Sequence, residues 1–507
     1  MAKTRKKPQQ LLAQSLKAAS NASRGNIVKS SYLDRKYRER LINAGFLTEV
    51  IRGWYLLRSA DGDSGSTAWF GGFWAFLQYY LDDRFGKNKY CLSAESSFNL
   101  YAGDTFVPKQ IIVLTQKASN TTISLPHNTS ILLLTDSKNF PDDVERINGI
   151  TRMSLPFALS RLTPTYYRKN PRNIEIVLKI SSLSVSEISR TLLKTENIAS
   201  AERIIGAYKY LGEVSKSEQI RGDISAAGYI LKDINPFDEY LPKLAEMRFS
   251  SPYVGRIRLM WNEMRLVVID NLPSSPGVVG DKKQTIEVIQ ETYKQDAYHS
   301  LSIEGYQVTE ELISKIESGE WDPENIIDDR KQRDALAAKG YHNAFQEVIM
   351  SITKVLNGES SGSVLSNDLQ KWYRQLFTPL LVANLLEPEK VVGYRNHPVY
   401  ISNSRHVPPP SSAVLECMET LFQLLKEEHH AGVRAILGHF IFVFIHPYMD
   451  GNGRIARFIM NLMLISGGYP WAIIRTENRE KYMSSLELAS TKEDIGKFAK
   501  FIASEIK

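Results

Sequence analysis

The sequence predicts a molecule of two parts, in which an α/β N-terminal region precedes a mainly α-helical C-terminal region. Short apolar runs rich in branched residues, which are typical of strands, occur in the first half of the chain. After about residue 215, apolar residues recur at helical spacing between breakers such as 271–277 and 357–363. The length of 507 residues corresponds to about three domains.

The composition is that of an ordinary soluble globular protein, with 43% hydrophobic and 23% charged residues. The two cysteines, Cys91 and Cys417, lie far apart and form no CxxC pair, which favours a reducing, cytoplasmic location. The basic N-terminus lacks the apolar segment of a secretory signal. The longest apolar run, 69–81, is too short to cross a bilayer, so we expect a buried helix there and no membrane partner.

The chain is basic, and the excess is concentrated at its N-terminal end. The net charge is +7, and the first 40 residues contain 11 lysines and arginines against 2 acidic residues. Such an end favours an anionic partner, with nucleic acid first. A solvated tail that aids solubility explains the charge equally well. We expect residues 1–24 to be a disordered basic arm.

Residues 25–60 have the outline of a winged helix. A predicted helix ends at Gly45, which is typical of a residue just beyond a helix C-terminus. Two short strands follow around Arg52 and Gly53. If this segment binds DNA, the residues that would contact phosphates are Lys36, Arg38, Arg40 and Arg52.

Residues 61–215 are expected to form an α/β domain. The runs 111–114 and 130–134 read as strands, and 182–210 reads as helices. No sequence period repeats, so a solenoid is not expected.

One short run near the C-terminus carries residues suited to phosphate chemistry. An apolar helix over 435–445 is expected to end at His446, because Pro447 disfavours helical geometry in the residue before it. The imidazole is then presented on a loop. The turn 450–453 leads into a second helix with an apolar stripe over 455–463, so backbone N–H groups at that helix N-terminus face the loop and favour phosphate.

The charged residues of this loop extend the same reading. Arg454 and Arg457 lie three positions apart and suit a polyphosphate. Asp450 offers a hard oxygen ligand for Mg²⁺, and His446 can accept a proton from a hydroxyl. Each feature alone is usually structural, but their conjunction within twelve residues indicates a functional site that binds phosphate groups.

The run 446–457 resembles the signature of the Fic family, HPFx(D/E)GN(G/K)RxxR, with Tyr448 in the place of phenylalanine. The resemblance extends over much of 230–505. It implies an N-terminal helical region with an inhibitory motif at 228–325, and a catalytic core at 326–507 that is a helical bundle with a β-hairpin flap.

The resemblance also implies an activity, which is transfer of AMP from ATP, with Mg²⁺ or Mn²⁺, to a Ser, Thr or Tyr hydroxyl of a protein substrate or of the chain itself. It implies that His446 is the general base and that Asp450 is the metal ligand. The α-phosphate would be bound by Gly451, Asn452 and Gly453. The β- and γ-phosphates would be bound by Arg454 and Arg457. Family members that phosphorylate carry lysine at the position of Gly453, so glycine favours adenylylation.

Two further segments resemble parts of the family's site. The run 393–401 resembles the β-hairpin flap, in which Gly393, Tyr394, Val399 and Tyr400 would bind a target segment by β-augmentation. A plain hairpin edge is the alternative. Asn478 and Tyr482 would line the pocket for the nucleotide base, whereas His439 is expected to be a core histidine.

A segment upstream resembles the family's inhibitory motif, (S/T)xxxE(G/N), with Ser300, Glu304 and Gly305 in the defining positions. Glu304 would pair with Arg457 and take away the guanidinium that the γ-phosphate needs. A helix that simply ends at Gly305 is the alternative. Some family members use this glutamate to remove AMP, which makes de-adenylylation a second activity. In the family such contacts form either within one chain or between two chains, so the sequence is compatible with both a monomer and a homodimer.

The N-terminal half resembles AbiEi-type antitoxin regulators over about 25–215, more weakly than the C-terminal part resembles Fic. This resemblance implies an alternative function, a DNA-binding regulator of a toxin–antitoxin kind with the Fic part as a regulatory or de-adenylylating module. A protein-interaction domain that recruits targets is another alternative. The complete signature argues against an inactive scaffold.

Overall fold

The computed structural model describes residues 8–58, 66–116, 120–136, 140–142, 144–147, 149–180, 183–244, 249, 251–278, 280–321 and 329–506. The chain divides into two compact units. The N-terminal unit consists of Met1–Pro252 together with Tyr400–Val407, and the C-terminal unit consists of Tyr253–Val399 together with Pro408–Lys507. Within the described ranges, no helix is both long and apolar enough to cross a membrane.

The N-terminal unit begins with a helix and a small sheet. Helix α1 (Pro8–Ala22) packs on α2 (Arg35–Asn43), and the antiparallel sheet has the order β1-β3-β2, with a single 3₁₀ turn, η1 (Ser30–Tyr32), after its first strand. The strands are β1 (Ile27–Lys29), β2 (Leu47–Ile51) and β3 (Trp54–Leu57). The two strands expected around Arg52 and Gly53 are thus confirmed as β2 and β3.

The expectation of a disordered arm over residues 1–24 was wrong for Pro8–Ala22, which is helix α1. Leu12, Leu16 and Ala19 fall on one face of this helix and pack in a small core with Leu41 of α2. This face gives the segment a reason to fold that its charge does not reveal. Residues 1–7 of the expected arm lie outside the described residues.

A four-stranded sheet and a long apolar helix follow. The sheet has the order β4-β5-β7-β6, in which β5 and β7 are parallel and the other pairs antiparallel. Its strands are β4 (Tyr90–Leu92), β5 (Gln110–Thr115), β6 (Thr121–Leu125) and β7 (Thr129–Thr135). The runs 111–114 and 130–134 are therefore strands, as predicted. The apolar run 69–81 is also confirmed as a buried helix, α3 (Ser66–Phe85).

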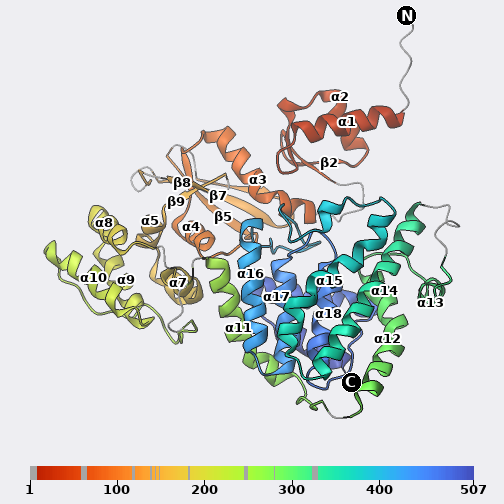
Figure 1. Ribbon diagram of the computed structural model, residues 1–507. Coiled ribbons are helices and arrows are strands. Elements are labelled where there is room, and N and C mark those ends of the chain that lie inside the picture. Colours follow the sequence, from red (N-terminus) through yellow and green to blue (C-terminus); the bar gives the residue numbers. More distant parts are fainter. Residues whose placement is uncertain are drawn as a thin grey trace, which may run out of the picture. The chain divides into compact units, whose positions relative to one another are not determined.

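The rest of the N-terminal unit is a hairpin and a set of helices (Figure 1). These elements are α4 (Ala94–Tyr101), β8 (Val144–Ile147), β9 (Ile150–Met153), α5 (Leu155–Ser160), α6 (Pro164–Lys169), α7 (Pro171–Leu178), α8 (Val185–Thr195), α9 (Ile198–Tyr210) and α10 (Val214–Ala226). The helices predicted over 182–210 are α8 and α9. The helices share a core of their own.

The segment Tyr400–Val407 completes the N-terminal unit although it comes from far along the chain. The Ser66 hydroxyl donates to Oδ1 of Asn403 at 2.7 Å, and the Asn403 N–H donates to Oγ1 of Thr67 at 2.8 Å. The Val107 N–H donates to the carbonyl of Arg405 at 2.9 Å. The chain therefore leaves the C-terminal unit before Tyr400 and returns to it after Val407.

The C-terminal unit is a helical bundle, as the sequence predicts (Figure 1). Its helices are α11 (Pro252–Asn271), α12 (Lys282–Ile303), α13 (Glu310–Ser318), α14 (Asp329–Leu356), α15 (Ser361–Val382), α16 (Val414–Glu427), α17 (Ala431–Ile445), α18 (Asn452–Ile465), α19 (Arg479–Lys492) and α20 (Gly496–Glu505). Almost every residue of α17 and α18 is buried, so these two helices form the centre of the bundle and fix the loop between them.

The β-hairpin flap expected at 393–401 is not observed. Between α15 and α16 the chain forms two 3₁₀ turns, η3 (Pro388–Val391) and η4 (Ser411–Ala413), joined by an irregular loop without strands. Two main-chain N–H groups that a hairpin would need are not available for pairing between strands. The Arg395 N–H donates to the Pro447 carbonyl at 2.8 Å, and Pro398 has no N–H. We call residues 393–399 the flap loop.

Candidate active site

The loop between α17 and α18 is held in one tight conformation. His446 ends α17 with φ 51° and ψ 62°, in the left-handed region, as expected for a residue that Pro447 excludes from the helix. Gly451, with φ 81°, begins α18. Oδ1 of Asn452 accepts from the Tyr448 N–H at 3.0 Å, and its Nδ2 donates to the Tyr448 carbonyl at 2.8 Å. Asn452 therefore braces the loop.

Tyr448 anchors the loop in the core, as expected for an aromatic residue at this position. Its side chain is 1% exposed and stacks on Tyr373 of α15, with ring centroids 3.7 Å apart. The substitution of tyrosine for phenylalanine in the motif thus keeps the aromatic packing.

His446 has the properties of a general base. Its Nδ1 lies 3.2 Å from the carbonyl of Val443, which favours the tautomer with the proton on Nδ1 and leaves Nε2 as the acceptor. Burial lowers the pKa of His446 to about 4; the Val443 carbonyl opposes this shift and the Arg395 cation adds to it. The imidazole is therefore neutral at pH 7 and able to take a proton.

The two arginines of the motif lie deep in the bundle with unsatisfied donors. Arg454 is 1% and Arg457 3% exposed. Nε and Nη2 of Arg454 and Nη1 of Arg457 have no hydrogen-bond partner among the described residues, although Arg454 Nη2 lies 3.3 Å from Asp450 Oδ1. Because buried donors are rarely left unpaired, these groups fit an anion that binds between them.

Glu304 reaches this pair of arginines from α12. It follows the last residue of α12, and Gly305, with φ 88°, turns the chain away from the helix. Arg457 Nη2 donates to Oε1 of Glu304 at 2.8 Å, and Arg457 Nε donates to the Ser300 hydroxyl at 2.8 Å. Burial opposes the charge on Arg457, but the Glu304 carboxylate raises the pKa of this guanidinium.

Gly453 makes room for this contact. A Cβ atom at Gly453 would lie 2.2 Å from Oε1 of Glu304, which is closer than nonbonded atoms approach. The Glu304 carboxylate therefore sits over the first turn of α18, where the helix dipole favours a negative charge. This is the place that the sequence assigned to a phosphate.

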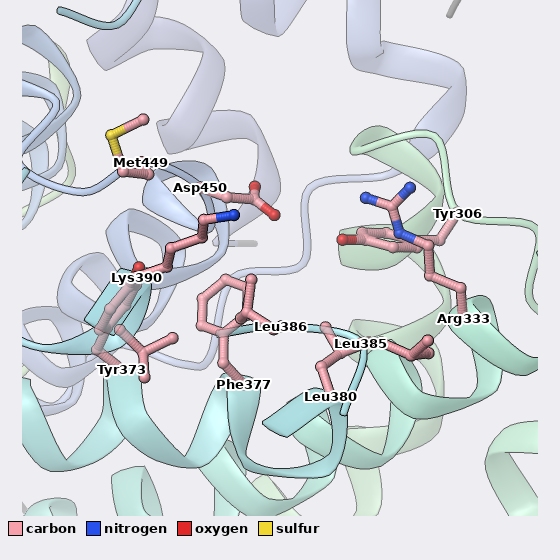
Figure 2. Close-up of a pocket in the computed structure, with 11 residues that line it drawn as sticks. Tyr306, Arg333, Tyr373, Phe377, Leu380, Leu385, Leu386, Lys390, Met449 and Asp450 are labelled. Atoms are coloured by element: carbon pink, nitrogen blue, oxygen red, sulfur yellow. The ribbon is translucent and has the colours of Figure 1, made fainter. Parts of the chain in front are cut away.

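A cavity of about 570 Å³ opens beside Asp450 (Figure 2). Its apolar floor comes from α15 and the chain that follows it, and Figure 2 shows Lys390 and Arg333 reaching it from opposite sides. The lining residues are Tyr306, Arg333, Tyr373, Phe377, Leu380, Leu385, Leu386, Lys390, Val391, Met449 and Asp450. Sequence reasoning missed Tyr306, Arg333 and Lys390, because they lie in no motif and come from three separate segments.

Asn478 and Tyr482 do not line this cavity. Nδ2 of Asn478 donates to Oε1 of Glu505 at 3.0 Å, and Tyr482 is 1% exposed with its hydroxyl 2.8 Å from Nε2 of His439. Their assignment to a base pocket stays a prediction. His439 is fully buried and burial lowers its pKa to about 3, as expected for a core histidine.

The residues expected in the flap differ in exposure, and they do not all lie in the same unit. Gly393 is exposed and Tyr394 and Val399 are half-buried, whereas Tyr400 packs against Gly71 within the N-terminal unit.

Of the residues expected to contact DNA, Lys36 and Arg52 are exposed. Arg40 Nη1 donates to the Ser15 hydroxyl at 2.7 Å, and Arg38 Nη1 donates to the Ser30 carbonyl at 3.1 Å. DNA binding by this end stays a prediction.

Comparison with known proteins gives a match at this site. Residues 364–464 match the sequence model of the Fic/DOC family. The chain is 28% identical over 248 residues to "Protein adenylyltransferase Fic" of Drosophila virilis, covering 48% of this chain and 47% of that protein. It is 27% identical over 247 residues to the protein of the same name from Drosophila melanogaster. The chain thus spans about half the length of the curated relatives it matches.

Solved structures give a weaker likeness. Fic-1 from C. elegans is 19% identical with a TM-score of 0.37, covering 66% of this chain and 89% of that one. A Fic domain containing signaling protein from Bacteroides thetaiotaomicron is 17% identical with a TM-score of 0.35, covering 50% and 93%. At these scores the structural likeness adds nothing to the match in sequence.

Proposed function

Because residues 364–464 of this chain belong to the Fic/DOC family, we propose that it is a protein adenylyltransferase, which transfers AMP from ATP to a hydroxyl side chain of a protein. The observation that carries the proposal is the combination, in one loop and the helix turn after it, of a neutral base with buried, unpaired guanidinium donors. A base alone would suit many reactions, but buried, unpaired donors on two neighbouring arginines select a polyanionic substrate.

The proposed reaction uses these groups in the following way. The hydroxyl oxygen of the protein substrate attacks the α-phosphorus of ATP and forms the new P–O bond. The bond between the α-phosphorus and the bridging oxygen breaks, and pyrophosphate leaves. The hydroxyl proton passes to Nε2 of His446, which is free because Nδ1 faces the Val443 carbonyl. Arg454 and Arg457 hold the departing phosphates.

Asp450 is the residue placed to hold Mg²⁺, which the family uses with ATP. Its side chain is 58% exposed and borders the cavity. The carboxylate would be one ligand of the ion, and phosphate oxygens and water would complete the coordination shell. When bound, the ion neutralises charge on the phosphates. The guanidinium donors of the arginines suit the phosphates of ATP, and the carboxylate oxygen of Asp450 suits the Mg²⁺ that accompanies them.

Glu304 restrains this activity in our proposal. Its carboxylate occupies the first turn of α18 and pairs with Arg457, so it competes with a phosphate for the same positive groups. ATP would then bind with its tail displaced from the position that in-line attack needs. Removal of the carboxylate should increase the rate of AMP transfer.

The experiment is incubation of the full chain with ATP labelled at the α-phosphate, with Mg²⁺ and cell lysate. We expect Glu304→Gly to label itself and other proteins more strongly than the wild type, and the double variant Glu304→Gly/His446→Ala to label nothing. Glu320→Gly is the matched control, since Glu320 lies just beyond α13 as Glu304 lies just beyond α12, whereas it is Glu304 that pairs with Arg457. No gain for Glu304→Gly would refute the restraint, and labelling that survives His446→Ala would refute the base.

The position of Glu304 also favours a second activity, the removal of AMP from a modified protein. The Glu304 side chain is 26% exposed and pairs with Arg457, and we propose that its carboxylate also holds a water for attack on the phosphate. We expect wild-type protein to release AMP from a protein modified beforehand by Glu304→Gly, and Glu304→Gly itself to release none. Equal release by both proteins would exclude this role.

A further inference from the structure

The flap loop contains one buried cation that neither the motif nor the proposed chemistry uses. Arg395 is 5% exposed, in a loop whose neighbours Asn396, His397 and Pro398 are exposed. A buried guanidinium in an otherwise open loop requires partners that repay the loss of water. Those partners are the main chain around His446.

Arg395 contacts the end of α17 through both side chain and backbone. Its Nε donates to the His446 carbonyl at 2.7 Å and its Nη2 to the Ile445 carbonyl at 3.3 Å. Its own N–H donates to the Pro447 carbonyl at 2.8 Å. The last carbonyls of a helix have no partner within the helix, and a cation there also complements the helix dipole.

The same side chain fixes the loop from which it comes. Nη1 of Arg395 donates to the His397 carbonyl at 3.2 Å, and Nη2 also donates to the Pro409 carbonyl. One planar guanidinium therefore joins the flap loop, the segment that leads into α16, and the last residues of α17.

His446 needs such support because its backbone is in an unfavourable region. The left-handed conformation is unfavourable for a non-glycine residue and persists only where the surroundings fix it. If the carbonyl of His446 is released, the peptide can rotate, and Nε2 then moves away from the position in which it meets a hydroxyl.

We propose that Arg395 is a positioning residue, which holds His446 in the left-handed conformation and couples this conformation to that of the flap loop. A protein segment seated on the flap loop would thereby find the imidazole in place. The kinetic part of this inference rests on the proposed AMP transfer, but the contact between Arg395 and His446 does not.

The kinetic test compares Arg395→Lys and Arg395→Gln in the active Glu304→Gly background, with Arg374→Lys and Arg374→Gln as matched controls. Arg374 is an exposed arginine of α15. We expect kcat to fall on the order of 100-fold for both Arg395 variants, because small misplacements of a base have effects of that size. KM for ATP should change less than about twofold, and the controls should keep kcat.

Lysine is the informative replacement. It keeps the charge and the packing of the stem but cannot reach several carbonyls with one planar fork. If Arg395→Lys keeps kcat, or if KM for ATP rises in proportion to the loss, Arg395 does not position the base. Because lysine preserves the buried charge, this variant decides the question even if Arg395→Gln fails to fold.

A second test does not depend on catalysis. The pKa and tautomer of His446 are measured by NMR on the full chain with labelled histidine, with His446→Ala for assignment. The charged and polar groups that face His446 are the Val443 carbonyl on α17, Arg395, Glu304 and Asp450. We expect Arg395→Lys to disturb the Nδ1-protonated tautomer and Arg395→Gln to raise the pKa from about 4 toward its ordinary value.

Unchanged histidine signals in both variants would overturn the proposal. If the signals change as expected but no variant of the chain transfers AMP, the proposed function fails while the positioning contact stands. The two failures are therefore distinguishable.

Discussion

Glu304 and Gly453 are interdependent residues of the site. A Cβ atom at position 453 would lie 2.2 Å from Oε1 of Glu304. Alanine is normally the better helix former, by roughly 1 kcal/mol relative to glycine. The absence of a side chain at Gly453 is therefore explained by the neighbouring carboxylate, and glycine here serves the contact between Glu304 and Arg457.

This pair predicts that Gly453→Ala changes the free energy of unfolding in opposite directions with and without the Glu304 carboxylate. In the wild type, Gly453→Ala should lower the free energy of unfolding by about 1–3 kcal/mol, because the new methyl group displaces the Glu304 carboxylate. In the Glu304→Gly background the same substitution should be neutral or stabilising. Chemical denaturation of the four proteins measures the coupling. Equal losses in both backgrounds would show that the two residues do not interact.

Two histidines with a lowered pKa predict how stability depends on pH. His446 and His439 have pKa values lowered to about 4 and about 3, below the value of about 6.5 in an unfolded chain. Between pH 6.5 and 4 the unfolded state binds protons that the folded state does not, so the free energy of unfolding falls as the pH falls. Each histidine contributes up to about 1.4 kcal/mol per pH unit.

Urea denaturation at pH 7 and pH 5 measures this dependence. His446→Asn removes one of the two groups, so its loss of stability on acidification should be smaller than that of the wild type. An identical loss in both proteins would mean that His446 titrates in the folded chain as it does in the unfolded chain, so that its pKa is not lowered.

Sequence reasoning located the residues that share one motif and missed those that converge on it from elsewhere. His446, Asp450, Arg454 and Arg457 lie within twelve positions, so their proximity follows from the chain itself. The pairing of Glu304 with Arg457 was anticipated from a resemblance. Arg333 and Lys390 reach the cavity from distant segments, and no local pattern shows which of many surface cations do so.

At the scale of elements, the loop between α17 and α18 is the part that the sequence specifies best. Pro447 excludes helical geometry before it and Gly451 supplies the positive φ at the start of α18, so the break and its position follow from two residues. The flap was predicted wrongly: the run 393–401 resembles the family's hairpin, but the buried Arg395 side chain binds carbonyls outside the loop and no strands form.

The brace formed by Asn452 predicts a loss of loop rigidity on its removal. Asn452→Ala deletes two hydrogen bonds to the Tyr448 backbone at a position 2% exposed. We expect the free energy of unfolding to fall by about 1–3 kcal/mol, with an accompanying loss of AMP transfer. Asn396→Ala, an exposed residue of the flap loop, is the control for stability. A change in Asn452→Ala no larger than in the control would contradict the brace.

At the scale of the whole molecule, the notable feature is that the chain crosses from one unit to the other and back between α15 and α16. Tyr400–Val407 belongs to the N-terminal unit, whereas the flap loop that precedes it belongs to the C-terminal unit. The sequence predicted the kinds of element in each half. It did not predict this exchange, because contacts such as Ser66 with Asn403 join residues more than 330 positions apart.

This connection predicts that loosening the segment in the N-terminal unit affects the flap loop. Asn403 has φ 58°, so Asn403→Gly keeps the backbone geometry and removes the side-chain contact with Ser66. Hydrogen exchange should become faster over 393–407 and stay unchanged in α17 and α18. Exchange that is unaltered over 393–407 would show that the anchor does not restrain the loop.

The most direct test of AMP transfer is to compare two labels on the same variant. Glu304→Gly is incubated with Mg²⁺ and ATP labelled either at the α-phosphate or at the γ-phosphate, and the label on protein is measured. AMP transfer predicts that the α-label is retained on protein and that the γ-label is released with pyrophosphate. Retention of the γ-label, or no retention of either label, would contradict the account.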